Sequence, residues 1–373
     1  MKDKLAEELL AKVLGWDPSD VAKERPVLQT MASLKYDAYE QYSPGLRFLE
    51  SLALWLNQFD SVDRRVAYDF LKSSLVYCSS DEMDHLVDTA YADHVRPILL
   101  ARSATEQKVN IWHIGRIAES VSFRAHQRQT LFLGLSDGAR IDTFRRANPD
   151  LNHEQICQTH ELADDRVNEL LDKLKEHLAD LGVCVESPPK FRSIVLLDDF
   201  SASGSSYYTK KPDGKVAGKV AKFLLALDDD ESTLHRLCDP AGIQILILIY
   251  MATDQAIEHL RDALKGPIQG VTTIQVQTVQ SVPARIKVCR EDQVVAFCKL
   301  IEKYYNDEVD RIIFDVHMKK GNTPDAKYGY ADCGLPLVLH HNTPNNSLAI
   351  LWFYENCPLR GLFPRVQRHR EMV

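Results

Sequence analysis

The stretch Ile194–Ser206 constrains the fold of this chain more than any other. It begins with the four apolar residues Ile194-Val195-Leu196-Leu197 and runs directly into Asp198 and Asp199. An apolar run without polar alternation is typical of a strand buried on both faces, as inside a parallel sheet. We therefore expect this strand to deliver two carboxylates to its carboxyl end, the edge at which open α/β sheets bind their ligands.

A turn of small residues follows the two aspartates. Short side chains leave backbone N–H groups and hydroxyls accessible, and a turn of this kind can wrap an anion. The alternative is an ordinary buried strand that ends in a Ser/Gly turn. The predicted anion-binding residues are Ser201, Ala202, Ser203, Gly204, Ser205 and Ser206.

The order of an apolar strand, two acids and a Ser-x-Gly-x-Ser loop resembles the phosphoribosyl pyrophosphate (PRPP) signature of the type I phosphoribosyltransferases. The resemblance implies that Asp198 and Asp199 hold the ribose 2′ and 3′ hydroxyls and contact Mg²⁺ through water. It also implies that the small-residue loop cradles the 5′-phosphate. Within the signature the sequence departs at Ser201, where an aliphatic residue is commoner.

A second strand–turn–helix pattern precedes this stretch. Leu131-Phe132-Leu133 predicts a short strand, and a helix is expected from Ala139 through Arg146. A Gly-containing turn at a helix N-terminus presents free N–H groups and the positive end of the helix dipole, which suits pyrophosphate. The turn resembles the pyrophosphate loop of the same family, with Arg140 available to neutralise charge; a plain strand–helix connection is the alternative. The loop residues are Leu135, Ser136, Asp137, Gly138 and Ala139.

The remaining pattern predicts a doubly wound α/β core. Apolar residues recur at helical spacing from Val167 to Leu181, where Gly182 ends the helix. A buried strand is expected at 243–252, a helix at 254–264 and a strand at 271–279. Phosphoribosyltransferases typically place a strand hairpin and a mobile lid between their two loops, and this chain departs from that pattern.

We expect three regions. Residues 1–126 predict an all-helical N-terminal region, 127–318 the phosphoribosyltransferase-like core, and 319–373 a C-terminal, hood-like extension that completes the site. The last region concentrates uncharged hydrogen-bonding groups after an apolar strand, as site loops do. Its substrate-binding candidates are Tyr330, His341, Asn342 and Asn345, and the alternative for these side chains is turn formation and capping.

Composition restricts the function classes. The net charge of −8 gives no general affinity for nucleic acid or anionic membranes, although a local basic patch is compatible with it. The N-terminus lacks the apolar segment of a signal peptide, and no apolar run is long enough to span a bilayer, so a cytoplasmic protein without membrane contact is expected. The eight cysteines show no zinc-binding spacing and are expected to be buried thiols.

Three functions remain open from the sequence. The combined motifs and the odd tail resemble phosphoribosyltransferase-like effectors of bacterial conflict systems, including those that accompany retrons, which implies an antiphage toxin that acts on PRPP or a nucleotide by glycosyl transfer or glycosidic-bond cleavage. A second reading is an inactive sensor of PRPP or a nucleotide. A third is a scaffold that docks a reverse transcriptase with its noncoding DNA/RNA, or a small regulatory subunit. No Walker A, Gly-x-Gly-x-x-Gly, Ser-His-Asp or Cys-His motif is recognisable.

Overall fold

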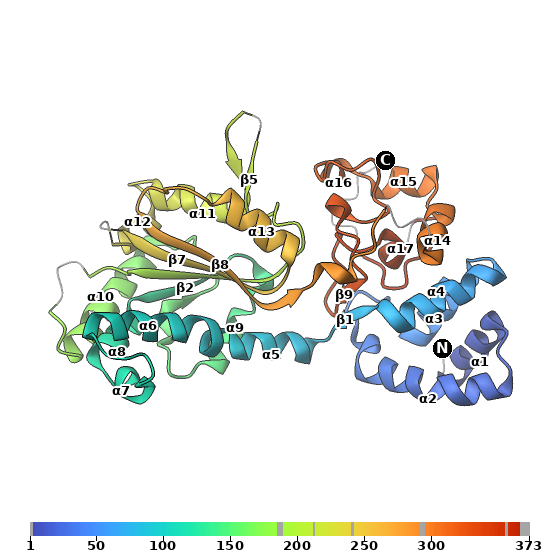
Figure 1. The fold of residues 1–373 in the computed structure, drawn as a ribbon, viewed down its shortest axis with the longest axis horizontal. Coiled ribbons are helices and arrows are strands. Elements are labelled where there is room, and N and C mark those ends of the chain that lie inside the picture. Colours follow the sequence, from blue (N-terminus) through green and yellow to red (C-terminus); the bar gives the residue numbers. More distant parts are fainter. Residues whose placement is uncertain are drawn as a thin grey trace. The chain divides into compact units, whose positions relative to one another are not determined.

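The computed structural model describes residues 3–184, 189–211, 213–239, 242–290, 295–354 and 357–365. The chain forms two compact units. Residues 83–282 form one, called here the sheet unit, and residues 1–82 together with 283–373 form the other, called the helical unit. Figure 1 shows the elements of both.

The sheet unit is built on five strands in the order β3-β2-β4-β7-β8, all of them parallel. The central strand β4 (Ser193–Ser201) lies between β2 and β7. Its register places Leu197 opposite Gly134 on one side and opposite Leu248 on the other. The other strands are β2 (Thr130–Gly134), β3 (Ile156–Cys157), β7 (Ile243–Thr253) and β8 (Val271–Val282).

Both faces of this sheet are covered, as the apolar run of β4 predicts. Leu131 and Leu196 belong to a core that includes helices α10, α11, α12 and α13. Phe132 alternates with Leu131 along β2 and so faces the opposite side of the sheet. Its ring centroid lies 6.1 Å from that of Tyr91 and 5.3 Å from that of Phe144. The doubly wound α/β fold expected from the sequence is therefore confirmed.

The helices and short turns of the sheet unit connect these strands. The helix predicted at 167–181 spans Asp164–Asp180 and buries four residues of the predicted apolar stripe, Val167, Leu170, Leu174 and Leu178. The elements are α5 (Ser80–Ala90), η2 (Tyr91–Val95), α6 (Arg96–Gln107), α7 (Ile114–Ala118), α8 (Val121–Arg128), η3 (Asp137–Ala139), α9 (Ile141–Ala147), η4 (His153–Gln155), α10 (Asp164–Asp180), β5 (Thr209–Lys210), β6 (Val216–Ala217), α11 (Lys219–Asp228), α12 (Thr233–Leu237) and α13 (Asp254–Ala263).

The helical unit joins the two ends of the chain around one core. Trp55 and Trp352 are both fully buried, and the indole N–H of Trp55 donates to the Ile350 carbonyl at 3.0 Å. The unit comprises α1 (Asp3–Leu14), α2 (Pro18–Leu34), η1 (Tyr36–Ala38), α3 (Phe48–Asn57), α4 (Ser61–Ser74), β1 (Val76–Cys78), η5 (Ala284–Ile286), α14 (Ala296–Tyr304), α15 (Asp307–Ile313), α16 (Val316–Lys319), η6 (Tyr330–Asp332), β9 (Leu337–Leu339) and α17 (Ala349–Trp352).

This organisation differs from the regions expected from the sequence in two respects. The N-terminal region is not entirely helical, because β1 pairs in parallel with β9 from the far end of the chain. The compact units also divide the chain at 82/83 and 282/283 rather than at 126/127 and 318/319. Residues 283–318 thus join the helical unit, while 83–126 join the sheet unit.

Among the described residues, no helix is both long enough and apolar enough to cross a membrane.

Candidate functional site

The two aspartates lie where the sequence places them, at the carboxyl end of β4. Asp198 is paired in register with Ile249 of β7, and its side chain is fully buried. Asp199 is half-buried, and its Oδ1 accepts a hydrogen bond from the N–H of Phe200 at 2.7 Å. Of the two carboxylates, Asp199 is therefore the one with surface to offer a ligand.

Asp198 is held by two side chains from other elements. The Ser136 hydroxyl donates to Oδ1, and the Lys219 ammonium lies 2.5 Å from Oδ2. Burial raises the pKa of Asp198, an effect that Lys219 opposes and the neighbouring Asp199 reinforces. These two contacts fix the position of the carboxylate, and its complete burial means that a ligand reaches it only if the side chains that cover it move.

The predicted pyrophosphate loop meets the two aspartates. The N–H of Leu135 donates to the Leu197 carbonyl at 2.9 Å, which continues the β2–β4 pairing into the loop. A side-chain carbon placed on Gly138 would lie 2.6 Å from Cγ of Asp199, closer than such atoms approach. Glycine is therefore required at 138 so that the backbone of this loop can lie against the Asp199 carboxylate.

The far side of the same loop is fixed by β7. The hydroxyl of Tyr250, which is fully buried, donates to the Ala139 carbonyl at 2.8 Å. Burial raises the pKa of Tyr250, and the charges of Asp198 and Asp199 add to the rise, so this phenol remains a donor. Loop 135–139 is thus anchored to both β4 and β7.

Arg140 has a different environment from the one expected. Its backbone is left-handed (φ 48°), a conformation uncommon outside glycine that recurs at functional sites. Its guanidinium lies 2.5 Å from Asp84 Oδ1 of α5. Its predicted role in neutralising pyrophosphate stays a prediction, and the ion pair with Asp84 competes with that role.

The small-residue loop turns sharply at Gly204. Gly204 adopts φ +75°, and a side-chain carbon there would lie 3.0 Å from the Ala256 carbonyl oxygen of α13. Within the described chain, no acceptor is hydrogen-bonded to the N–H groups of Ser203, Gly204 and Ser206. The loop is fixed instead through its carbonyls: that of Gly204 accepts from the amides at 207 and 208, and that of Ser206 from the amide of Lys219.

Two further residues of this loop are buried. Ala202 accepts a hydrogen bond at its carbonyl from the Thr253 hydroxyl at 2.5 Å. The Ser201 hydroxyl is buried and has no hydrogen-bond partner among the described residues. The part of Ser201 in phosphate binding stays a prediction. The groups of this loop that have no acceptor among the described residues are the amides at 203, 204 and 206.

The four substrate candidates of the tail belong to the helical unit. The N–H of Tyr330 donates to the Asn345 carbonyl at 2.7 Å, and its ring stacks on His317 with centroids 5.3 Å apart. The N–H of Asn342 donates to the Leu339 carbonyl at 3.0 Å, and its own side-chain oxygen is buried without a partner among the described residues. Contact of Tyr330, His341, Asn342 and Asn345 with a substrate stays a prediction.

Sequence reasoning missed Lys219 and Tyr207. Lys219 opens α11, and its ammonium lies over the Tyr207 ring, 5.1 Å from the centroid. Tyr207 is fully buried and donates to the Phe200 carbonyl at 3.2 Å. Lys219 follows the phosphate loop by only thirteen positions, yet nothing in the sequence distinguishes it from the exposed lysines nearby.

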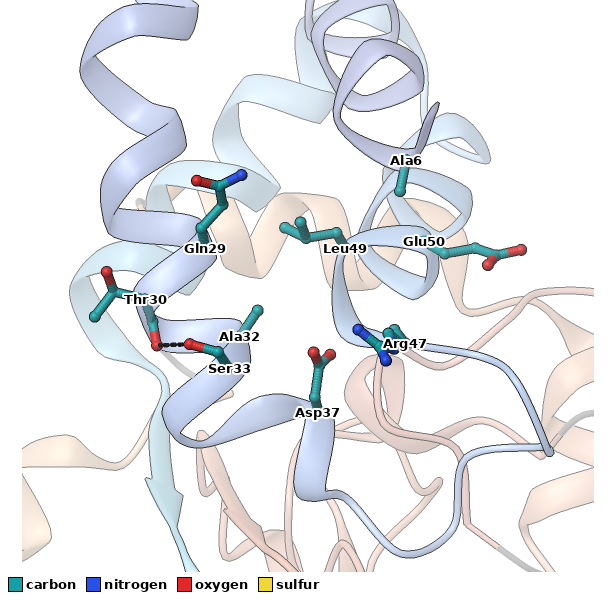
Figure 2. Close-up of a pocket in the computed structure, with 9 residues that line it drawn as sticks. All are labelled: Ala6, Gln29, Thr30, Ala32, Ser33, Asp37, Arg47, Leu49 and Glu50. Atoms are coloured by element: carbon teal, nitrogen blue, oxygen red, sulfur yellow. Dashed lines mark hydrogen bonds between the residues drawn. The ribbon is translucent and has the colours of Figure 1, made fainter. Parts of the chain in front are cut away.

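The helical unit contains a cavity of about 290 Å³ between α1, α2 and α3 (Figure 2). Its polar lining includes Gln29, Asp37, Arg47 and Glu50. The Asp37 carboxylate accepts from the N–H of Phe48 at 2.9 Å, so one wall of the cavity is part of the α3 N-terminus. Two carboxylates against one guanidinium do not favour an anion such as a phosphate, and we assign the cavity no part in the predicted site.

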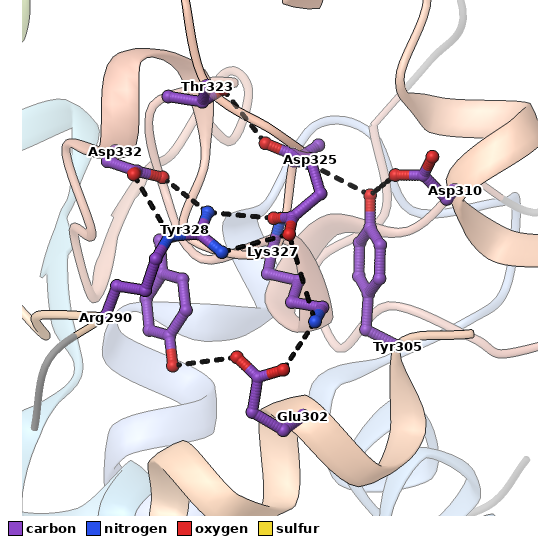
Figure 3. A network of polar contacts seen from close by, with 10 residues as sticks. Arg290, Glu302, Tyr305, Asp310, Thr323, Asp325, Lys327, Tyr328 and Asp332 are labelled. Carbon is purple, nitrogen blue, oxygen red and sulfur yellow. Dashed lines mark hydrogen bonds and ion pairs between the residues drawn. The ribbon is translucent and has the colours of Figure 1, made fainter. Parts of the chain in front are cut away.

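The helical unit also holds an ion-pair network (Figure 3). The Arg290 guanidinium donates to both oxygens of Asp325 at 2.9 Å and to Asp332 at 2.8 and 3.1 Å. Lys327 extends the network to Glu302. All the cations here are satisfied by carboxylates, so the network links segments of the unit rather than forming a ligand site.

The comparisons agree with the geometry of β4 and its loops. The model of the PRTase-CE family matches residues 52–365, which is most of the chain. No curated protein and no solved structure matches the chain.

Proposed function

This chain belongs to the PRTase-CE family, which is of the phosphoribosyltransferase type, and from that premise we propose that its sheet unit binds the ribose 5-phosphate part of PRPP or of a nucleotide. One observation carries the proposal. Asp199, the backbone of Gly138 and the amides of the small-residue loop that have no acceptor among the described residues follow the carboxyl end of β4. A sugar phosphate needs this combination of a carboxylate for its hydroxyls and N–H groups for its phosphate.

The proposed chemistry is displacement at ribose C1′, either transfer to an acceptor or cleavage of a glycosidic bond. As the C1′ bond to the leaving group lengthens, positive charge grows on the ribose and negative charge on the leaving group. Asp199 would orient the ribose hydroxyls, and the loop around Gly138 would face the leaving group. Preorganised donors at such a position typically lower a barrier by about 2.7–4 kcal/mol each.

Magnesium is part of the proposal in a limited sense. Among the described residues, no cluster of three or more His, Cys, Asp or Glu side chains is able to hold a metal. Mg²⁺ commonly binds through one or two carboxylates together with substrate phosphates. Asp199 fits this mode, whereas Asp198 has both oxygens occupied by Ser136 and Lys219. Magnesium bound with the substrate would supply charge neutralisation at pyrophosphate.

A second candidate function is favoured by the same ion pair. Because Asp198 is fully buried against Ser136 and Lys219, the two carboxylates of the signature are not equivalent, and Asp199 is the one that is partly exposed. A protein that binds PRPP or a nucleotide without turnover needs only the phosphate loop and one hydroxyl ligand. A sensor of this kind would show ligand binding without products.

The biological setting is likewise a proposal. On the resemblance to effectors of bacterial conflict systems, we propose an antiphage toxin of the cytoplasm that acts on nucleotides. Its activity would be held in check by a reverse transcriptase with noncoding DNA/RNA or by a small regulatory subunit. The scaffold alternative gives this docking role to the chain without catalysis.

The test combines binding with product analysis. The purified full chain is mixed with Mg²⁺, PRPP and a panel of nucleotides; binding is followed by calorimetry and products by mass spectrometry. Asp198→Asn with Asp199→Asn should abolish binding and any turnover. The matched control is Asp180→Asn with Asp228→Asn, which removes two exposed carboxylates from the ends of α10 and α11.

The outcomes separate the alternatives. Binding with products supports the enzyme, and binding without products supports the sensor. If the wild-type chain binds neither PRPP nor any nucleotide, or if the 198/199 double variant binds as well as its control, the ribose phosphate site is refuted.

A further inference from the structure

A lysine-bearing hairpin rises directly from the phosphate loop. Residues 207–211 and 213–218, called here the lysine hairpin, contain the antiparallel strands β5 and β6 with Thr209 opposite Ala217 and Lys210 opposite Val216. Figure 1 shows β5 projecting from the body of the sheet unit. No function proposed above uses this element.

The base of the hairpin is fixed to the phosphate loop. The Thr209 hydroxyl donates to the Ser205 carbonyl at 2.7 Å, and the ring nitrogen of His259 lies 2.9 Å from the Tyr208 carbonyl. Gly218 has φ +114°, and a side-chain carbon there would lie 2.5 Å from the carbonyl carbon of Tyr207. These contacts make the hairpin a continuation of the phosphate loop and not an independent surface loop.

The charge of the hairpin is concentrated and uncompensated. Lys210, Lys211 and Lys215 are all exposed, and none forms an ion pair with a described residue. The one carboxylate of the hairpin, Asp213, accepts from the N–H of Lys215 at 3.0 Å and so serves the turn. By contrast, many other lysines of the chain are paired with carboxylates, among them Lys35, Lys72, Lys173, Lys219, Lys265, Lys303 and Lys327.

The unpaired lysines of the hairpin are suited to a ligand that carries negative charge beyond its 5′-phosphate. Lys210 lies four residues past Ser206, a distance of up to roughly 13 Å along an extended chain. A mononucleotide gathers its phosphates at the 5′ position, within the phosphate loop itself. A nucleic-acid strand whose terminal nucleotide occupies the site continues past the loop, with a further phosphate at each nucleotide.

We propose that the lysine hairpin binds the phosphodiester backbone of a single nucleic-acid strand whose 3′-terminal nucleotide occupies the phosphate loop. The proposal rests on the proposed ribose phosphate site and names the class of its ligand. The net charge of the chain is −8, and the proposal is compatible with it because positive charge is needed only along the path of the bound strand, where the lysine hairpin lies.

The experiment measures binding of a 5′-labelled oligouridylate of about twelve nucleotides, whose 3′-terminal ribose has both hydroxyls and whose length lies within common single-strand site sizes. Fluorescence anisotropy is recorded for the full chain between about 50 and 200 mM salt. The test variant is K210Q/K211Q/K215Q. The control, K173Q/K175Q/K265Q, removes three exposed lysines of the same unit and changes the net charge equally. PRPP and a nucleoside triphosphate are titrated in parallel.

The expected effect follows from counterion release. Each lysine that neutralises a phosphate of a single strand contributes about 0.7 to the slope of log affinity against log salt. The slope of the test variant should therefore be about 2 shallower than that of the wild type. Over a fourfold rise in salt, the affinity of the wild type should then fall about 20-fold more than that of the variant. PRPP binding should stay unchanged in both triple variants.

The proposal is overturned if the wild type does not bind the oligonucleotide, or if the test and control variants lose oligonucleotide affinity equally. It is also overturned if the test variant loses as much affinity for the nucleoside triphosphate as for the oligonucleotide, because the lysines would then bind a mononucleotide's own phosphates. Failure of the ribose phosphate site is seen separately, because PRPP would then not bind the wild type at all.

Discussion

A methyl group added at Gly138 tests the contact between the two loops of the candidate site. The backbone of Gly138 lies against Asp199, and the new carbon would fall 2.6 Å from Cγ of that carboxylate and 3.0 Å from Oδ1. The neighbouring atoms belong to a half-buried side chain, which is able to rotate away. Gly138→Ala should therefore move Asp199 while leaving the β2–β4 pairing intact.

The size of the effect follows from what Asp199 is proposed to bind. A hydrogen bond to a charged group contributes about 1.5–3 kcal/mol, so turning the carboxylate away from a ribose hydroxyl should weaken PRPP binding roughly ten- to 150-fold. The free energy of unfolding should fall by only about 1 kcal/mol, the cost of an off-rotamer side chain. Binding is thus expected to change more than stability.

The assay is calorimetric titration of the full chain with PRPP and Mg²⁺, alongside urea unfolding of the same samples. Gly115→Ala is the matched control, because an added carbon at Gly115 of α7 meets nothing within 4 Å. Unchanged PRPP affinity in a folded Gly138→Ala protein would refute the apposition of the two loops as the ligand site.

Three further substitutions probe the site and the helical unit. Lys219→Met leaves Asp198 buried without its cation and should lower the free energy of unfolding by about 3–5 kcal/mol near pH 7. Burial already raises the pKa of Asp198 above 3.8, so its ionised form lowers the stability of the fold as pH rises through the folded pKa. The stability lost by the Lys219→Met variant should therefore be smaller in urea titrations near pH 4 than near pH 7. An equal loss at both pH values would contradict this. Arg290→Ala should cost about 1.5–3 kcal/mol. Burial raises the pKa of Asp325, but Arg290 and Lys327 together bring it below 3.8. The wild type therefore loses the stability that Asp325 contributes as pH falls below 3.8; the variant should lose less, as urea unfolding at about pH 7 and pH 3 would show. Gly204→Ala forces a side chain into a left-handed conformation (φ +75°) at a cost of about 1–2 kcal/mol and should abolish PRPP binding in the same calorimetric assay; retained binding would exclude the loop as the phosphate site.

Local patterns were sufficient to predict four of the five strands of the sheet and the two loops, but not the two-residue edge strand β3. The uninterrupted apolar run at 194–197 predicts a strand buried on both faces, and β4 is that strand. The strand–turn–helix pattern at 131–146 corresponds to β2, η3 and α9. These predictions succeed because strand burial, turn formation and helix periodicity depend on residues within a few positions of one another.

The partners of the charged groups were not predictable in the same way. Ser136 and Asp198 are 62 positions apart, and Arg140 and Asp84 are 56 apart. Pairing over such separations depends on which strands become neighbours and which helix ends meet them. For the same reason the pairing of β1 with β9 and the division into two units could not be derived from the order of the elements.

The sequence by itself determined that a buried strand carries two aspartates and a small-residue loop to one edge of a parallel sheet, since hydrophobic burial and the period of side chains along a strand leave little alternative. Only the tertiary structure decided that the two aspartates are unequal. Asp198 is fully buried against Ser136 and Lys219, while Asp199 is only half-buried where the backbone of Gly138 lies against it. Burial and charge pairing are set by atoms brought together across the fold, and these distinguish two identical side chains that adjoin in the chain.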